Sequence, residues 1–503
     1  MNHFAHTSYP ALILLAVLSL LVGCSTTKSI PENDQLYTGL TKIVYNTSDR
    51  GAHLTLTKEE VSAALATAPN GALFGSSSVR SPFPIGLWVW NEFVNSNGVL
   101  GKWMLKSFGS NPVLMSWVNP ELRASVAKEV LRAHGYFRGN VTYDVVKQRN
   151  PKEAKIGYTV NTGPLFTIDS LDYVGFPPVA DSLIRSSLAE AKVKKGDAFD
   201  VSTLDAERSR ISSLFRNNGF FYYQSGYSSY LADTLQVPGH VQLRFQEADN
   251  IPQVAKRKWA IGNVDIDMRR NYGDTLRNTV KVRHLAVNYN GRRPPIRVGT
   301  ILRNMRLMPG QPYSYLGHQE SANRLSSTGL FSLVDFNFTP RDTTGACDTL
   351  DLRLNLLFDK PYDFYIQGNI TGKTNNRIGP GVTVGLTKRN AFRGGELLDI
   401  NLKGSYEWQT GHQADGTSSK LNSYEYGIDA SLQFPRLILP WSKQIRRWMW
   451  RRAQKTHFFS APTTKLKFSS DIIRRSNYFT RHIVSGEWTY ELQTSATSRH
   501  QWS

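Results

Sequence analysis

The chain has 503 residues, of which 40% are hydrophobic and 20% are charged, and its formal net charge is +20. This length predicts several domains, and this composition excludes both a disordered chain and a helical membrane protein. Lys and Arg are spread along the sequence, with one local concentration at residues 446–455, "RRWMWRRAQK". Because spread charge does not form a binding stripe, we expect no nucleic acid partner.

The N-terminus holds the one long apolar run, Ala11 to Val22, which is followed by Gly23 and Cys24. This pattern predicts a bacterial lipoprotein signal at residues 1–24, with a diacylglyceryl group and further acyl (palmitate-type) attachment at Cys24. At about 0.8 kcal/mol per buried methylene, three acyl chains anchor a protein firmly. An uncleaved anchor or a buried helix is the alternative. The leaflet stays open, although Ser25 favours sorting to the outer membrane.

Three segments end a helical pattern with glycine followed by aromatic or apolar residues: "GYF" at Gly135, "GFF" at Gly219 and "GLF" at Gly329. Each glycine is predicted to be a left-handed helix C-cap, and the residues after it are predicted to start a strand. The three sites indicate a repeated module of about 80 residues with the order β-α-α-β-β. We expect the repeats at residues 25–162, 163–250 and 251–360.

The second repeat is the clearest. It predicts strands at 166–175 and 240–247, a strand beginning at Phe220 and Tyr222, a helix at 181–191 opened by Asp181, and a helix at 201–219 capped by Ser202 or Thr203. In the first repeat we expect a strand at 41–46, a helix at 58–68 and two strands after Gly135. The third repeat predicts a strand at 260–268 that leads to a helix at 298–307. Each small sheet is expected to have an exposed edge strand. Such an edge strand is either covered by a neighbouring repeat or paired with an extended client peptide, and the sequence favours neither alternative.

Residues 71–120 form an aromatic-rich insertion in the first repeat that contains Trp88, Trp90, Trp103 and Trp117. These side chains predict either a satellite core packed on the host repeat or a surface for membrane or partner binding. The first reading is the commoner for such clusters.

After Pro361 the hydrophobic pattern becomes strictly two-fold, and about six segments of roughly ten residues alternate in this way. The first sets Tyr362, Phe364, Ile366, Gly368 and Ile370 against polar neighbours. A soluble sandwich also alternates, but segment length, aromatic ends and the polar second face favour an antiparallel transmembrane β-barrel at residues 361–503. The basic segment 446–455 falls between the fourth and fifth strands. Contact with lipid head groups and a solvated loop are equally open roles for it.

Together, the repeats ending in "GYF", "GFF" and "GLF" and the segment "GPGVTVGLTKRNAFRGGELLDINLKGSYEW" (379–408) resemble the BamA/TamA outer-membrane assembly superfamily. "FPRLILP" (434–440) and "NYFTRHIVSGEWTYE" (477–491) are similar to its lipid-anchored TamA-like (TamL-type) branch. The resemblance implies α+β POTRA repeats in the periplasm that receive unfolded outer-membrane clients. It also implies a barrel in the bacterial outer membrane that opens laterally at its first strand, which here carries Tyr362, Phe364, Ile366, Gly368 and Ile370. Outer-membrane lipid and a TamB-like inner-membrane or periplasm-spanning protein are the further implied partners.

Other classes fit less well. No HExxH, G-x-S-x-G or CxxC motif occurs, and the histidines show no ligand spacing, so we expect no enzyme, no cofactor and no metal site. A two-partner secretion transporter and a barrel-anchored lipoprotein that translocates nothing are the alternatives. Because the superfamily barrel has about sixteen strands and the last residues predict no terminal strand, we expect the sequence to be a fragment of a longer protein.

Overall fold

The computed structural model describes residues 26–503 except residues 82, 283, 343–346, 374–376, 410–422, 439–461, 476–478, 494 and 496. The chain divides into two compact units, Met1–Arg210 with Gly226–Ala248 and Ile211–Ser225 with Asp249–Ser503. The division passes through helix α8 (Val201–Asn217), so the four predicted domain boundaries inside these units stay predictions. In the described part of the chain, no helix is long and apolar enough to cross a membrane.

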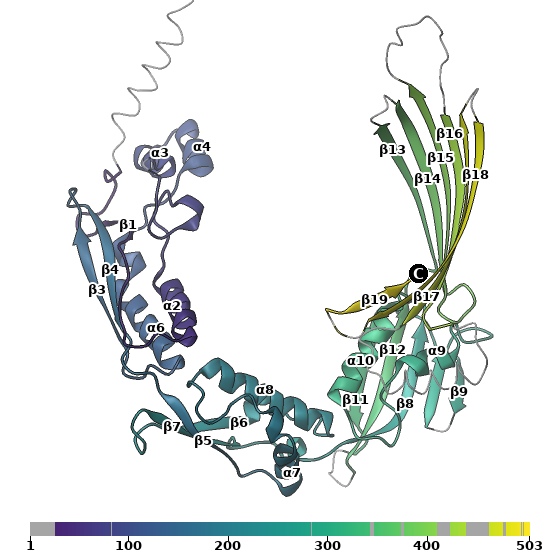
Figure 1. Cartoon of the computed structure of the whole chain (residues 1–503), viewed down its shortest axis with the longest axis horizontal. Helices are drawn as coiled ribbons and strands as arrows, with labels where there is room; N and C mark the ends of the chain where they lie inside the picture. Colours follow the sequence, from purple (N-terminus) through teal and green to yellow (C-terminus); the bar gives the residue numbers. More distant parts are fainter. Residues whose placement is uncertain are drawn as a thin grey trace, which may run out of the picture. The chain divides into compact units, whose positions relative to one another are not determined.

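In the first repeat, two helices cover one face of a small sheet (Figure 1). The central strand β4 pairs in parallel with β1 and β2, and β3 pairs antiparallel along its other edge. The predicted helix at 58–68 begins earlier, at Ala52, and the predicted strand at 41–46 is preceded by a further strand. The elements are β1 Leu36–Leu40, β2 Val44–Asn46, α2 Ala52–Leu65, α6 Pro120–Ala133, β3 Asn140–Lys147 and β4 Glu153–Asn161.

The aromatic insertion is helical, with η1 Leu73–Gly75, α3 Ile85–Phe93, α4 Val99–Phe108 and α5 Met115–Val118. Its small core joins Leu87 and Leu114 to Ile30 and Leu36. Trp88 and Trp90 are half-buried, whereas Trp103 and Trp117 are 55% and 63% exposed. The small core shared with β1 agrees with the predicted satellite core, whereas membrane or partner binding by the exposed tryptophans stays a prediction.

The second repeat has the element order β5, α7, α8, β6, β7, and its sheet order is β5-β7-β6. Helix α7 starts at Pro178 and not at Asp181, because proline occupies its first turn. Asp200, and not Ser202 or Thr203, caps α8: its carboxylate accepts the Ser202 N–H at 2.7 Å and its carbonyl accepts the Leu204 N–H at 3.1 Å. The elements are β5 Thr167–Val174, α7 Pro178–Ser186, η2 Leu188–Glu190, η3 Ser225–Tyr227, β6 Ser228–Asp233 and β7 His240–Glu247.

The glycines of the three helix ends have φ angles of 83° at Gly135, 103° at Gly219 and 65° at Gly329, so the left-handed C-caps are confirmed. The predicted strand beginning at Phe220 is wrong, since β6 starts at Ser228. Phe220 and Tyr223 instead turn back onto Phe215, with ring centroids 5.4 Å and 4.8 Å from it. Only after Gly329 does the aromatic residue begin a strand at once.

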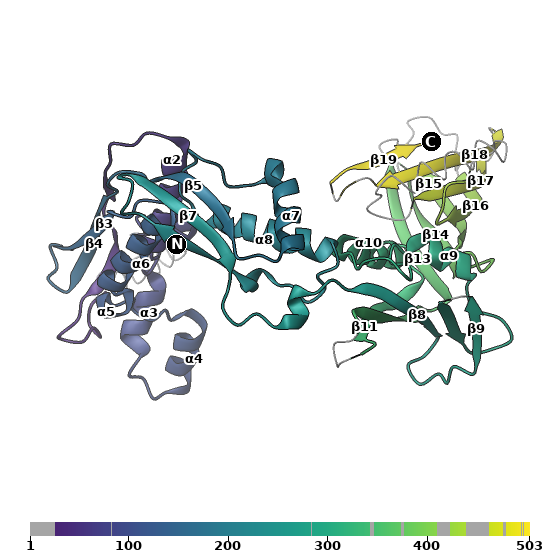
Figure 2. The same cartoon turned by 90° about the horizontal axis from the view of Figure 1, so that it is seen from below.

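The third repeat contains a hairpin, β9–β10, that the sequence analysis did not predict. It lies between β8 and α9, and the sheet order is β11-β12-β8-β10-β9. Helices α9 and α10 cover one face of this sheet (Figure 2). The elements are η4 Gln253–Lys256, β8 Ala260–Arg269, β9 Asn278–Val282, β10 Leu285–Tyr289, α9 Val298–Asn304, α10 Tyr315–Ser326, β11 Phe331–Pro340 and β12 Thr349–Phe358.

The chain ends in one antiparallel sheet of seven strands, ordered β13 to β19 as in the sequence (Figure 1). The sequence predicted about six strands here and no strand among the last residues. The additional strand is short and pairs with the end of β18, between Tyr490↔Trp502 and Gln493↔Arg499. The elements are β13 Tyr362–Lys373, β14 Arg377–Arg389, β15 Leu397–Gln409, β16 Ser423–Phe434, β17 Thr463–Arg475, β18 Phe479–Gln493 and β19 Arg499–Trp502.

Candidate functional site

Strand β13 lies at one edge of the seven-stranded sheet (Figure 1). It pairs with β14 along its whole length, from Tyr362↔Lys388 to Lys373↔Arg377, with no shift of register. Among the described residues, no strand pairs with its other side. An edge of this length presents a row of backbone groups to which another strand can pair.

The register determines which residues of β13 point their backbone groups outward. Just before the strand, the Arg389 N–H donates to the Pro361 carbonyl at 2.9 Å, which makes this a hydrogen-bonded pair. Hydrogen-bonded and non-hydrogen-bonded pairs alternate along an antiparallel ladder. Odd-numbered residues of β13 therefore bond to β14, and even-numbered residues direct N–H and C=O to the open edge. The outward set includes Tyr362, Phe364, Ile366, Gly368 and Ile370.

The same even-numbered residues place their side chains on the apolar face of the sheet. One row across the strands is Ile366, Val384, Leu402 and Ile428. Ile366 is 66% exposed and Ile370 is 78% exposed. Contiguous exposed apolar faces are rare on soluble monomers, and they indicate contact with lipid or a partner.

The opposite face of the sheet is polar, and its side chains bond to one another across the strands. The Tyr365 hydroxyl donates to Asn401 Oδ1 at 2.9 Å, and the Thr387 hydroxyl donates to Asp399 Oδ1 at 2.6 Å. Lys403 forms an ion pair with Asp429. One face of the sheet therefore carries these cross-strand polar pairs and the other the exposed apolar side chains, so the sheet has one side suited to lipid and one suited to water or protein.

A tight turn between β14 and β15, residues 390–396, fixes the sheet to the third repeat. Asn390 Nδ2 donates to the Pro295 carbonyl at 2.9 Å, and an Arg393 guanidinium N–H donates to the Pro294 carbonyl at 2.8 Å. Glu396, which is 3% exposed, accepts the Gly394 N–H at 2.8 Å inside the turn. The left-handed φ angles of 57° at Asn390 and 66° at Arg393 are held by these bonds.

Cations surround this turn. Burial lowers the pKa of Arg303 in α9, and nearby Arg436 lowers it further, whereas Glu396 acts in the opposite direction. Arg389 holds the start of β13, since it pairs with Asp363 at 2.5 Å and donates to the Lys360 carbonyl at 3.1 Å. In the sequence, the Asn and Gly residues of this turn are the signal for positive φ angles.

The small sheets of the repeats also have open edges. Strands β3, β6, β9 and β11 each pair with one strand of their own sheet within the part of the chain that the structure describes. Cover by strand pairing with a neighbouring repeat, which the sequence left open, is therefore not observed for these edges.

The structure also bears on the remaining predicted sites. Cys24 and the basic segment 446–455 lie outside the described residues. His53, His134 and Asp200 come together in the first unit, although the sequence predicted no metal site. Their separations along the chain match no ligand motif, so no local signal pointed to them.

No protein-family model matches the chain, and no curated protein matches it. Among solved structures, BamA from Haemophilus ducreyi lacking POTRA domains 1–3 is similar at 15% identity and a TM-score of 0.33, over 65% of this chain and 59% of that chain. POTRA3–5 of Haemophilus influenzae BamA is similar at 12% identity and a TM-score of 0.30, over 65% of this chain and 99% of that chain. CdiB from Acinetobacter baumannii is similar at 11% identity and a TM-score of 0.28, over 66% and 58%. This chain therefore spans less than two thirds of the BamA and CdiB chains of the first and third comparisons.

Proposed function

We propose that this protein is an outer-membrane assembly or translocation factor of the BamA/TamA type, in its lipid-anchored TamL-type branch, and that it performs no enzymatic reaction. Its repeats take up unfolded outer-membrane clients in the periplasm, and its sheet inserts them at the edge formed by β13. One observation carries the proposal: among the described strands β13 pairs with β14 alone, and its outward backbone groups belong to residues with exposed apolar side chains.

Strand addition supplies the mechanism. A client segment that lies along β13 receives hydrogen bonds from alternate N–H groups, such as that of Ile366, and donates to the matching carbonyls. Backbone pairing of this kind does not depend on the client's sequence. A client segment in which apolar and polar side chains alternate then continues both faces of the sheet, with its apolar side chains beside Ile366 and its polar side chains beside Gln367.

The repeats, the outer-membrane lipid and a partner protein also have roles in the proposed function. Open edges such as β6 and β9 offer extended clients the same backbone pairing before they reach β13. Outer-membrane lipid covers the apolar face of the seven-stranded sheet, and acyl chains on Cys24 add a second attachment. A TamB-like protein is the proposed partner across the periplasm.

The test is a pair of variants at one position of β13 in the native gene. Ile366→Ala and Ile366→Pro both remove the apolar side chain, but only proline removes the outward N–H, and proline is tolerated at an edge position whose N–H bonds nothing. We expect the proline variant to deplete outer-membrane β-proteins, measured by quantitative mass spectrometry of purified outer membranes. The alanine variant is expected to resemble the wild type.

Equal proteomes in the two variants would contradict pairing at β13. Loss of a single secreted protein, with an otherwise unchanged outer membrane, would favour a two-partner-type transporter. No change even on deletion of the gene would favour a lipoprotein that is merely anchored by its sheet.

A further inference from the structure

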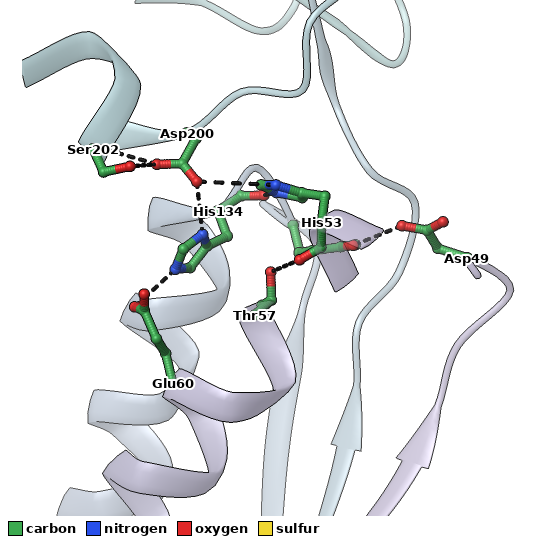
Figure 3. Close-up of polar contacts among 8 residues, drawn as sticks. Asp49, His53, Thr57, Glu60, His134, Asp200 and Ser202 are labelled. Carbon is green, nitrogen blue, oxygen red and sulfur yellow. Dashed lines mark hydrogen bonds and ion pairs between the residues drawn. The ribbon is translucent and has the colours of Figure 1, made fainter. Parts of the chain in front are cut away.

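Two histidines of the first repeat and one aspartate of the second meet at the junction of these repeats (Figure 3). His53 lies in the first turn of α2, His134 follows α6, and Asp200 caps α8. Asp200 Oδ2 is 2.9 Å from His134 Nδ1 and 4.0 Å from His53 Nδ1. The side chains of His134, Asp200 and His53 are 9%, 15% and 20% exposed.

Each of the three residues offers a donor atom of a type that Zn²⁺ binds, and these donor atoms lie within 4.8 Å of one another. Around tetrahedral Zn²⁺ with bonds of about 2.0–2.1 Å, donor atoms lie about 3.3 Å apart. The distances from Asp200 Oδ2, 2.9 Å to His134 Nδ1 and 4.0 Å to His53 Nδ1, fall on either side of that value, and the shorter one is a hydrogen bond that a bound ion would replace.

The remaining polar atoms of the three residues are already occupied, as expected for metal ligands. His134 Nε2 is 2.9 Å from Glu60 Oε2, and His53 Nε2 is 2.9 Å from the carbonyl oxygen of His134. A ligating histidine almost always donates its second N–H to a carboxylate or a backbone carbonyl in this manner. Asp200 Oδ1 accepts both the N–H and the hydroxyl of Ser202, which leaves Oδ2 to face the two rings.

We propose that His53 Nδ1, His134 Nδ1 and Asp200 Oδ2 bind one divalent transition-metal ion, with Zn²⁺ as the preferred occupant. Imidazole nitrogens together with a carboxylate suit Zn²⁺ and exclude Mg²⁺ and Ca²⁺, which take oxygen ligands. Three protein ligands leave a fourth position for water, and the partial exposure of His53 gives the ion a path to the site.

The ion has a structural role, because its ligands come from both repeats. Besides these side chains, the junction contains a backbone bond from the Phe166 N–H to the Gly135 carbonyl at 3.0 Å, the contacts of Phe137 with Phe166 and Phe199, and the Arg138 guanidinium over the Phe166 ring. A metal bridge from α2 to the start of α8 therefore fixes the angle between the repeats. This inference does not depend on the proposed function.

The experiment titrates the full chain, purified in detergent and stripped of metal, first with Co²⁺ and then with Zn²⁺. Co²⁺ in a tetrahedral site of mixed nitrogen and oxygen donors gives strong visible bands, and Zn²⁺ abolishes them on displacement. We expect one equivalent per chain. Glu60→Gln weakens affinity about 10- to 100-fold, as loss of an outer carboxylate does elsewhere, and His53→Gln and Asp200→Asn weaken it further.

Matched controls are His240→Gln and Asp205→Asn, which change an exposed histidine and an exposed aspartate of the same unit and should leave the titration unchanged. Circular dichroism without metal must be equal for all variants, so that lost binding is not unfolding. Zn²⁺ is also expected to slow amide exchange of Phe166 in the wild type only. Equal affinity in the wild type and Asp200→Asn, or an octahedral Co²⁺ spectrum, would overturn the proposal.

Discussion

A buried ion pair in α8 gives a sharp test of how the second repeat is stabilised. Arg210 donates from Nε and from a terminal nitrogen to the two carboxylate oxygens of Glu207, at 2.9 Å and 2.7 Å. The Glu207 side chain is 0% exposed. Its carboxylate also accepts the Tyr173 hydroxyl at 2.7 Å and the Lys192 N–H at 2.8 Å. The perturbation is Arg210→Ala, which leaves the carboxylate buried without its counter-ion.

The expected loss follows from burial. Removal of one partner from a buried pair costs about 3–5 kcal/mol, because the other charge stays desolvated. The same helix supplies a matched control, since Arg208 and Asp205 form a pair with the same i,i+3 spacing and the same 2.7 Å distance but lie at the surface. Arg208→Ala should cost about 0–1 kcal/mol. The burial of Glu207 and the additional bonds of Arg210 to Glu207 and Ser187 separate the two predictions.

Amide hydrogen exchange of the full chain, followed by mass spectrometry, measures local stability. This assay suits a protein of several domains, because one global unfolding transition is not expected. At about 1.4 kcal/mol per factor of ten, a loss of about 3–5 kcal/mol in Arg210→Ala should speed exchange in α8 and β7 by about 10²- to 4 × 10³-fold. Arg208→Ala should change it less than about fivefold. Similar rates in the two variants would refute the assignment of stability to the buried pair.

Three further predictions concern other features of the chain. Burial alone would raise the pKa of Glu207, but Arg210, the Lys192 N–H and the Tyr173 hydroxyl outweigh it and hold the pKa below its usual value. This lowered pKa stabilises the folded state fully at pH values above the unfolded-state pKa of Glu207, and the stabilisation is lost as the pH falls through the folded-state pKa. Glu207→Gln should therefore reduce the acceleration of α8 amide exchange at low pH, after correction for intrinsic exchange rates. An unchanged acceleration would contradict the linkage. Gly219→Ala, at a φ of 103°, should destabilise the helix end by about 1 kcal/mol or more, measured by exchange of α8, whereas Gly226→Ala, with no atom within 4 Å of the added carbon, should change little. Cys24→Ser should abolish incorporation of an alkyne-labelled fatty acid, and labelling that persists would place the lipid elsewhere.

Period-two alternation over long segments made the strands of the C-terminal sheet predictable. The first predicted segment, Tyr362 to Ile370, lies within β13 Tyr362–Lys373, and the later strands β15 Leu397–Gln409 and β16 Ser423–Phe434 alternate in the same way. One face of these strands is uniformly apolar, so a shift by one residue would expose the wrong side chains. The strand β19 was missed because four residues are too few to show any period.

Local patterns failed where distant packing determines the conformation. Phe220 and Tyr223 have strong strand preferences, but they pack on Phe215 at the end of α8 and so form a turn. The hairpin β9–β10 was not predicted because each of its strands is only five residues long. It interrupts a repeat whose predicted order contained no such insertion. Short elements carry little pattern of their own.

The candidate site was predictable in position and not in geometry. The alternation placed Tyr362 to Ile370 on one face of the first strand. Which residues direct N–H groups to the open edge follows only from the bond between Arg389 and Pro361. Likewise, His53 and Asp200 are far apart in the sequence and meet only through the packing of the first two repeats.

The most direct test of the account is photo-crosslinking at two positions of one row of the sheet. Ile366 and Leu402 lie on the same face and in the same row, but Ile366 belongs to the edge strand β13 and Leu402 to the interior strand β15. With a photoreactive residue at each position in living cells, adducts are identified by mass spectrometry. We expect adducts with strands of nascent outer-membrane proteins at position 366 and none at position 402. Equal adducts at both positions, or none at 366, would contradict client pairing along β13.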